Sequence, residues 1–257
     1  MNFSLITLLV RSLMEKEILM KISLIIPAYN EEKRIKKTLL DYDRFLQSNY
    51  SDYEIIVVCD GCQDHTPMIV KDFTEINSRI KLLEFEHRLG KGGGLIEGFK
   101  NAAGEIIGFT DADGATSPFE YKKLIESVMK DVDVVIGSRK VKGAKIAVHQ
   151  SIDREFASKI FNLFINMVFA LSVHDTQCGA KVFKRDVIEN ILPKLVTRGF
   201  EIDVELLWRA KKENYKLKEI PIVWEHKEEA VFNFKFIPNM FIGLLKLSIR
   251  GHKKQYE

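Results

Sequence analysis

Apolar runs alternate with amphipathic stretches over the first 140 residues, and this alternation restricts the fold more than any other feature. The apolar runs have the length of buried strands, which we predict over residues 22–26, 53–58, 80–85, 106–110 and 132–136. The stretches between them have helical spacing of apolar residues, and these helices are predicted over residues 31–47, 66–77 and 91–103. Such βαβ units form a mainly parallel sheet covered by helices. Pro27 is expected to end the first strand.

The C-terminal part of the sequence is more helical. Helices are predicted over residues 156–171, 200–212 and 236–249, and a strand over residues 217–223. Asn and Lys residues interrupt the first of these helices, which fits a half-buried or interfacial helix better than a membrane span. With no internal repeat or linker in the sequence, one domain is expected over residues 20–235. Residues 1–19 are expected to be an extension or to precede a true start at Met20, and residues 236–257 to be an amphipathic, basic segment.

Length, charge and cysteine content exclude several classes of protein. A chain of 257 residues is long enough to bury a full core. Its formal net charge of +3 is too small to indicate nucleic-acid binding. Three cysteines do not suggest a disulfide framework and fit a reducing compartment. Cys59 and Cys62 lack the second ligand pair of a zinc site, so we interpret their spacing as coincidence.

Two carboxylates follow the apolar run over residues 106–110. Asp111 and Asp113 are therefore expected outside the carboxyl end of a strand, where open α/β sheets bind their ligands. Paired carboxylates suit a hard divalent cation, and such cations commonly hold diphosphates in enzyme sites. A solvated turn is the alternative, because Asp and Gly are ordinary turn residues.

Polar or glycine-rich turns follow other predicted strands at the same edge of the sheet. The glycines over residues 90–94 have neither Walker nor Rossmann spacing. They form either a flexible loop or a backbone that approaches a phosphate or sugar closely, with Arg88 and Lys91 supplying charge. Asp60 either caps a helix or accepts a hydrogen bond from a base N–H or a ribose hydroxyl.

Taken together, these motifs resemble family-2 glycosyltransferases of the GT-A type over residues 20–250. The resemblance is nearest to dolichyl-phosphate glucosyltransferases and next to dolichyl-phosphate mannosyltransferases. Pro-Ala-Tyr-Asn-Glu at residues 27–31 is shared across the wider family. Asp-Ala-Asp-Gly-Ala-Thr at 111–116 and Asp-Thr-Gln-Cys-Gly at 175–179 are specific to the glucosyl branch. The resemblance implies a GT-A nucleotide-diphospho-sugar transferase fold with C-terminal amphipathic helices.

The resemblance also implies a donor site. Asp60 would contact the uracil, and the nucleotide-sugar pocket would comprise Pro27, Ala28, Tyr29, Asn30, Glu31, Asp60, Arg88, Lys91, Asp111 and Ala112. Asp111 and Asp113 would hold Mg²⁺ or Mn²⁺ against the donor diphosphate. Mannosyl relatives have a further side-chain ligand where this chain has Ala115, so water, Thr116 or the diphosphate would complete the coordination shell.

Catalytic residues are implied for the acceptor side of the site. Asp113 is implied as one catalytic residue. A basic cluster for the lipid phosphate and the transferring centre would comprise Arg139, Arg154 and Lys181. Sugar recognition or base chemistry is implied for Glu201, Asp203 and Glu205. Residues at i and i+2 do not share a helix face, so at most one or two of these acidic side chains would face the site.

The implied function is inverting transfer of glucose from UDP-glucose to dolichyl or polyprenyl phosphate. One alternative uses GDP-mannose or another UDP-sugar on the same lipid. Another transfers sugar to a saccharide hydroxyl, with Asp203 or Glu201 as base, and a third is a non-catalytic nucleotide-sugar binder. The segment over 236–257 fits either an amphipathic helix in an anionic membrane interface or a helix packed on the core. We therefore expect a peripheral protein on the cytoplasmic side of a membrane.

Overall fold

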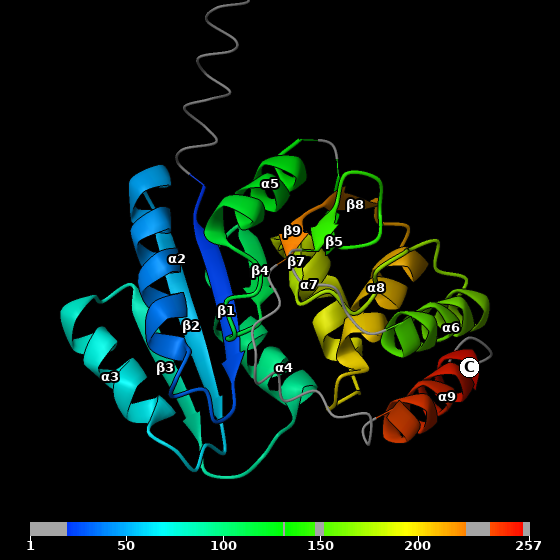
Figure 1. Cartoon of the computed structure of the whole chain (residues 1–257), viewed down its shortest axis with the longest axis horizontal. Helices are drawn as coiled ribbons and strands as arrows, with labels where there is room; N and C mark the ends of the chain where they lie inside the picture. The colour runs from blue at the N-terminus through cyan, green and yellow to red at the C-terminus, as the bar shows by residue number, and fades with distance from the viewer. Residues whose placement is uncertain (1–19, 131, 147–151, 225–236, 254–257) are drawn as a thin grey trace, which may run out of the picture.

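The computed structural model describes residues 20–130, 132–146, 152–224 and 237–253 (Figure 1). These residues form a seven-stranded sheet in the order β3-β2-β1-β4-β7-β5-β8. Its strands are β1 (Ile22–Ala28), β2 (Tyr53–Asp60), β3 (Ile80–Phe85), β4 (Ile106–Thr110), β5 (Val134–Ser138), β7 (Ala180–Lys184) and β8 (Leu217–Pro221). A small parallel sheet pairs β6 (Lys145–Ile146) with β9 (Val223–Trp224).

Helices cover both faces of the large sheet, as Figure 1 shows. One face packs against α2 (Ile35–Asn49), α3 (Thr66–Ile76) and α5 (Pro118–Val128). The other face packs against α4 (Lys91–Asn101), α6 (Ile152–Phe169), α7 (Arg185–Ile191), α8 (Ile202–Lys212) and α9 (Ile237–Lys253). A short 3₁₀ helix, η1 (Leu192–Lys194), follows α7. Alternate residues of β1 explain this division, because Leu24 and Ile26 enter one core and Ile25 enters the other.

The predicted mainly parallel sheet is confirmed. β1 pairs in parallel with β2 and β4, β2 pairs in parallel with β3, and β5 pairs in parallel with β8. β7, however, runs antiparallel between β4 and β5, and the apolar pattern of the sequence did not predict it. The helix α5 was also not predicted, although Ser117 caps its N-terminus by accepting a hydrogen bond from the Glu120 amide.

The prediction that Pro27 ends the first strand is wrong, since β1 continues to Ala28. The N–H of Ile22 donates to Asp52 on the β2 side. N–H directions alternate along a strand, so position 27 would donate on the β4 side. Pairing with β4 has already ended at Ile25. The N–H that proline lacks therefore costs the sheet no hydrogen bond at this position.

Several predicted boundaries also differ from the structure. The helix expected from Glu31 begins at Ile35, because the Glu31 and Glu32 amides donate to the Thr66 and Asp64 side chains and hold a loop there. The strand expected over 217–223 is divided between β8 and β9, which belong to different sheets. The predicted extension over 1–19 lies outside the described residues, as do residues 225–236 near the expected domain boundary.

Candidate active site

Asp111 and Asp113 follow β4, and Asp111 lies against the loop that precedes β7. The Asp111 side chain is 42% exposed. It lies so close to Gly179 that a Cβ at that position would come within 1.7 Å of Asp111 Oδ2. Asp113 Oδ1 accepts a hydrogen bond from the Ala115 amide at 2.9 Å. Burial raises the pKa of Asp113, and the neighbouring charge of Asp111 raises that pKa further.

Glu31 adds a third carboxylate beside this acidic pair. Burial raises the pKa of Glu31, and the charges of Asp113 and Asp111 add to the rise. Arg34 opposes it by donating to the two Glu31 oxygens at 2.6 and 2.7 Å. The loop after β1 therefore places negative charge, partly neutralised by Arg34, next to the end of β4.

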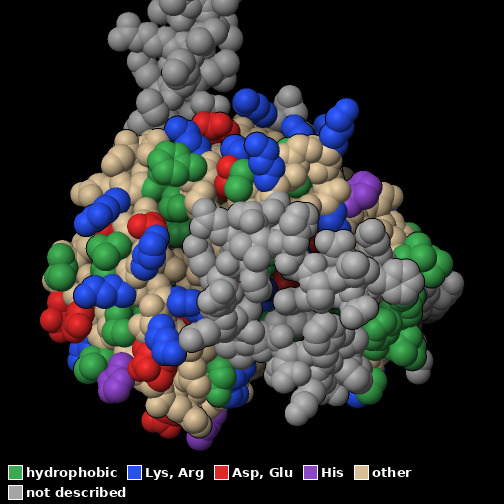
Figure 2. All heavy atoms as spheres, viewed as in Figure 1, with side chains coloured by type: hydrophobic (Ala, Val, Ile, Leu, Met, Phe, Trp, Pro, Cys, Tyr) green, Lys and Arg blue, Asp and Glu red, His purple; other side chains and the backbone are tan. Residues whose placement is uncertain are grey.

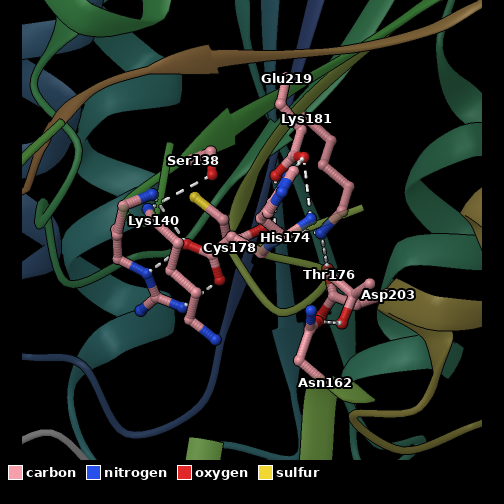
Figure 3. A network of polar contacts seen from close by, with 11 residues as sticks. Ser138, Lys140, Asn162, His174, Thr176, Cys178, Lys181, Asp203 and Glu219 are labelled. Carbon is pink, nitrogen blue, oxygen red and sulfur yellow. Dashed lines mark hydrogen bonds and ion pairs between the residues drawn. The ribbon is translucent and has the colours of Figure 1, made fainter. Parts of the chain in front are cut away.

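Two lysines and a buried carboxylate form a charged cluster beside the acidic pair. Lys91 Nζ lies 3.1 Å from Asp111 Oδ1 and 2.9 Å from Asp203 Oδ2. Lys181 donates to the other oxygen of Asp203 and, at 2.6 Å, to the carbonyl of Cys178. Figure 3 shows Lys181, from β7, reaching toward Asp203, from α8. The cluster thus joins α4, β7 and α8 at the end of β4.

The charges in this cluster stabilise one another. Burial raises the pKa of the Asp203 carboxyl, but Lys181 and Lys91 outweigh it and leave that pKa below its usual value. Burial lowers the pKa of Lys91, but Asp111 and Asp203 outweigh it and raise that pKa above its usual value. Asp203 is therefore a buried carboxylate held between two ammonium groups, which makes it a weak proton acceptor.

Arg139 directly follows β5 and is held by Asp175. Its Nε and Nη2 atoms donate to the two Asp175 oxygens at 2.7 and 2.8 Å, and its backbone amide donates at 2.9 Å. Burial raises the pKa of Asp175, but Arg139 outweighs it and lowers that pKa. The Arg139 guanidinium also lies 5.4 Å from the centroid of the Trp224 ring. These contacts give Arg139 a defined orientation next to the acidic pair.

Asp60, at the end of β2, holds the loop that leads into α4. Its carboxylate accepts hydrogen bonds from the amides of Leu89 and Gly90 and from Arg88 Nε at 3.2 Å. Gly90 has a φ of +81°, and a Cβ there would lie 2.3 Å from the carbonyl oxygen of Arg198. Glycine is therefore required at the start of α4 by both its conformation and its surroundings.

The loop after β1 lies beside the loop held by Asp60. The Arg88 guanidinium lies 3.4 Å from the centroid of the Tyr29 ring, in a cation–π contact. Asn30, which has a φ of 54°, accepts a hydrogen bond from the Gln63 amide at 2.8 Å. The structure thus brings the ends of β1, β2 and β4 together, as expected for Pro27, Ala28, Tyr29, Asn30, Glu31, Asp60, Arg88, Lys91, Asp111 and Ala112.

Of the three acidic residues predicted from the sequence around the start of α8, Asp203 is the one that contacts Lys91 and Lys181. Glu205 is fully buried and accepts hydrogen bonds from Val196, Thr197 and Arg209. Glu201 lies against α9, since a Cβ on Gly243 would come 3.1 Å from its Cδ. Arg154 belongs to α6, but its side chain is not among those described.

Sequence reasoning missed two residues that order the site. Asp175 was quoted within a motif but received no role, although its contact with Arg139 is bidentate. Glu219, in β8, accepts hydrogen bonds from the backbone of residues 174 and 175. Glu219 gave no local signal in the sequence, because the two residues that donate to it lie 45 and 44 residues away along the chain.

Asp111 and Asp113 fit a divalent cation whose coordination a substrate completes. Within the described ranges, no cluster of three or more His, Cys, Asp or Glu side chains is arranged to hold a metal ion. Mg²⁺, however, is usually bound by one or two carboxylates together with waters and substrate phosphates. A cation would also relieve the repulsion that raises the pKa of Asp113. Thr116 is buried and its carbonyl accepts from Tyr42, which favours water and the diphosphate as further ligands.

Comparison with known proteins gives consistent matches. The family model described as "Glycosyl transferase family 2" matches residues 23–192. Dolichyl-phosphate beta-glucosyltransferase ALG5D of Trichomonas vaginalis is 34% identical over 243 residues, covering 89% of this chain and 73% of that protein. The dolichyl-phosphate beta-glucosyltransferase of Saccharomyces cerevisiae is 34% identical over 221 residues, covering 79% of this chain and 66% of that protein.

A solved structure supports the same fold. Glucosyl-3-phosphoglycerate synthase from Mycobacterium tuberculosis, in complex with Mn²⁺, UDP-glucose and phosphoglyceric acid, matches with a TM-score of 0.64. The match covers 86% of this chain and 77% of that chain, at 16% sequence identity. At this identity the likeness concerns the arrangement of helices and strands, which is the fold expected from the sequence.

Proposed function

Because the chain belongs to glycosyl transferase family 2, we propose that it transfers glucose from UDP-glucose to dolichyl phosphate or another polyprenyl phosphate. The names of its relatives support both the sugar and the class of acceptor. The transfer would invert the anomeric centre, since the acceptor oxygen attacks the face opposite the leaving UDP.

One observation carries this proposal: an acidic pair and two largely buried lysines meet at the end of β4. Lys91 contacts both Asp111 and Asp203, and Lys181 contacts Asp203 from the other side. The donor diphosphate and the acceptor phosphate are both anions, so their approach requires fixed positive charge around the reacting atoms. The acidic pair would serve the donor through a cation, and the basic residues would serve both phosphates.

On the donor side, Asp60 is proposed to contact the uracil. Its carboxylate already accepts hydrogen bonds from the loop over residues 88–90. A carboxylate has about four acceptor positions, so a base N–H can share an oxygen with those amides. Asp111 and Asp113 would hold Mg²⁺ or Mn²⁺, and the bound cation would neutralise charge on the departing diphosphate.

On the acceptor side, Arg139, Lys181 and Arg154 are proposed to bind or face the lipid phosphate. A phosphate monoester has a second pKa of about 6, so its oxygen is already an anion near neutral pH. It would form a bond to the anomeric carbon as the bond from that carbon to the diphosphate breaks, and UDP would leave with the electron pair. No proton has to be removed from the acceptor.

The absence of a required base suggests another role for Asp203. Its lowered pKa and its position between two ammonium groups support a role in holding Lys91 and Lys181. Glu201 or Asp203 would be needed as a base only with a saccharide hydroxyl as acceptor. The contact between Glu201 and α9 does not favour that chemistry.

The paired helices α6 and α9 are proposed to rest on the membrane that holds the acceptor. Their inner faces pack together, with Phe241 lying 5.2 Å from Phe161 and 4.8 Å from Phe164 between ring centroids. Their outer faces expose apolar side chains of Ile160, Leu163, Met167, Ile242, Leu245 and Ile249. Figure 2 shows hydrophobic side chains at the right-hand edge of the molecule, where Figure 1 places these helices.

These exposed side chains suit a helix that lies in the membrane interface. Among the described helices, none has both the length and the apolar character needed to cross a bilayer. One face of the C-terminal helix packs on the core, and its exposed apolar face supports the proposed role in a membrane interface. We propose peripheral binding on the cytoplasmic side, which the free thiols of Cys59, Cys62 and Cys178 support.

A donor screen tests the proposed function. Purified protein is incubated with a short polyprenyl phosphate, Mg²⁺ or Mn²⁺, and radiolabelled UDP-glucose, UDP-N-acetylglucosamine, UDP-galactose or GDP-mannose. We expect label in the organic phase with UDP-glucose alone, and its loss with EDTA. Label from another donor would overturn the sugar assignment, and UDP release without a lipid product would indicate a saccharide acceptor.

A further inference from the structure

Glu219 is a partly buried carboxylate whose hydrogen-bond partners belong to one short stretch of the chain. Its Oε2 accepts from the His174 amide and lies 2.8 Å from His174 Nδ1, and its Oε1 accepts from the Asp175 amide at 2.9 Å. The Glu219 side chain is 9% exposed, whereas that of His174 is 70% exposed. Figure 3 shows Glu219 and His174 close together on one side of the polar network. Both Glu219 oxygens therefore fix the backbone at residues 174 and 175.

The stretch that Glu219 fixes carries the partner of Arg139. Asp175 accepts three hydrogen bonds from Arg139, one from the backbone amide and two from the guanidinium. A guanidinium has five N–H donors, so this pair uses only part of its capacity. A bidentate contact fixes the plane of the guanidinium as well as its position. The direction in which its remaining donors point thus depends on where Asp175 lies.

The same loop reaches other residues of the site. Between α6 and β7 it contacts Lys181 through the Cys178 carbonyl, and Gly179 lies against Asp111. Glu219 is the β8 residue paired in register with Ile136 of β5, and Arg139 follows the end of β5. Two adjacent strands therefore supply the arginine and the carboxylate that aligns its partner.

Close packing does not fix the Glu219 side chain by itself. A cavity of about 220 Å³ adjoins it and is lined also by Ile136, Val173 and Lys218. The hydrogen bonds to residues 174 and 175 therefore contribute to holding the carboxylate in place. A glutamine at this position would fit the space but would present an amide N–H₂ to a backbone donor.

We propose that Glu219 is a positioning residue for the acceptor phosphate, acting through Asp175 on the guanidinium of Arg139. This inference rests on the proposed role of Arg139 in binding the polyprenyl phosphate. Glu219 itself touches neither substrate. Its main effect is on the affinity for the acceptor, because Asp175 contacts Arg139, whereas the loop meets the donor side at Gly179, four residues further on.

Glu219→Gln in the full chain tests this inference. We expect the KM for polyprenyl phosphate to rise roughly 10- to 100-fold, because small displacements of orienting groups have effects of this size. The KM for UDP-glucose should change less than about twofold, because substitutions at sites that share no direct contact have nearly additive effects. Glu54→Gln is the matched control, since Glu54, which lies in β2 away from the site, is a 2% exposed carboxylate that accepts from the Ser23 hydroxyl and the Ala103 amide. That variant should lower the Tm and leave both KM values unchanged.

A double variant separates positioning from general loss of structure. In an Arg139→Ala background, Glu219→Gln should cause no further rise in the KM for the acceptor, because the group it positions is absent. A further rise in that background would overturn the inference, as would an unchanged acceptor KM in Glu219→Gln alone. If Glu219→Gln does not fold, Glu219→Asp, which keeps the charge but shortens the side chain, should give the same KM pattern.

The outcome for Arg139→Ala alone tests the underlying function. An unchanged acceptor KM in that single variant would overturn the proposed role of Arg139, whatever Glu219→Gln does. A raised acceptor KM in Arg139→Ala, with none in Glu219→Gln, would retain the proposed role and overturn the positioning by Glu219.

Discussion

The carboxylate of Asp111 lies directly against the α-carbon of Gly179, where a Cβ would come within 1.7 Å of Oδ2. This contact joins the loop before β7 to the acidic pair after β4. A side chain at position 179 and the present position of Asp111 are mutually exclusive. A glycine at position 179 is therefore required for the Asp111 side chain to occupy its position in the acidic pair.

Gly179→Ala should displace Asp111 and lower turnover by roughly 100-fold, the size expected when a reacting group is held about 1 Å out of place. Turnover with UDP-glucose and a short polyprenyl phosphate measures this. Gly104→Ala is a suitable control, because its Cβ would come 2.6 Å from the Ser23 amide nitrogen, at the opposite edge of the sheet. It should lower the Tm but leave turnover per folded molecule unchanged. Full turnover by Gly179→Ala would contradict the role of Asp111.

Asp113→Asn should remove activity without removing stability. Burial and the charge of Asp111 raise the pKa of Asp113 in the folded protein. Its ionisation therefore destabilises the folded state as the pH rises from about 4, the unfolded value, through the raised folded value. Near pH 7 the variant should unfold at a Tm no lower than that of the original protein.

Turnover of Asp113→Asn should nevertheless fall by about 100-fold or more, since a cation at such a site contributes several kcal/mol. Thermal shift with UDP and Mn²⁺ provides a separate measurement, in which the metal-dependent rise in Tm should disappear. Normal turnover, or a metal-dependent rise equal to that of the original protein, would remove Asp113 from the proposed cation site.

The family and the fold were predictable because their signals are local. The alternation of strands and helices, and the segments at residues 27–31 and 111–116, each lie within short stretches of sequence, and the resemblance they predicted is confirmed. β7 was missed because Lys181 interrupts its apolar residues. That lysine is fully buried, and its charge is accommodated by Asp203, which lies 22 residues further along the chain.

The ordering of the site depends on contacts that no local pattern contains. Asp175 meets Arg139 across 36 residues, and Glu219 meets Asp175 across 44 residues. The sequence could restrict how many acidic residues near α8 face the site, but only the fold shows that Asp203 does so and Glu205 does not. Which side chains meet is set by the order of β7, β5 and β8 in the sheet.

Asp203→Asn should strongly destabilise the protein at neutral pH. The substitution leaves the fully buried Lys181 without its counter-charge, while Lys91 keeps its pair with Asp111, and breaking a buried ion pair typically costs about 3–5 kcal/mol. Denaturant unfolding at pH 7 measures the free energy of unfolding. Asp41→Asn provides the contrast, because its pair with Lys37 has side chains 42% and 78% exposed and should contribute at most about 0.5 kcal/mol.

The pH dependence of stability should change with the same variant. The pKa of Asp203 is lowered in the folded protein, so its contribution is present above the unfolded value of about 4 and is lost as the pH falls through the folded value. The stability of Asp203→Asn should therefore fall less steeply in acid than that of the original protein. Parallel stability curves down to about pH 2 would contradict the charged state assigned to Asp203.

Leu163→Glu and Leu245→Glu should weaken binding to membranes. The two side chains are 59% and 48% exposed on the outer faces of α6 and α9. Burying a leucine side chain in an apolar phase contributes about 1.5–3 kcal/mol, so each substitution should lower the partition coefficient for anionic vesicles about tenfold or more. Flotation with vesicles of phosphatidylserine and phosphatidylcholine measures this, and the Tm should change little because both positions are exposed.

Ile76→Glu separates a membrane-binding surface from hydrophobicity in general. Ile76 is 86% exposed, more than either leucine, but it lies at the end of α3, on the opposite face of the sheet from α6 and α9. If α6 and α9 rest on the lipid, Ile76→Glu should float as well as the original protein. Equal losses for Ile76→Glu and the two leucine variants would indicate nonspecific adsorption, because the lipid would then not distinguish these helices from the rest of the surface.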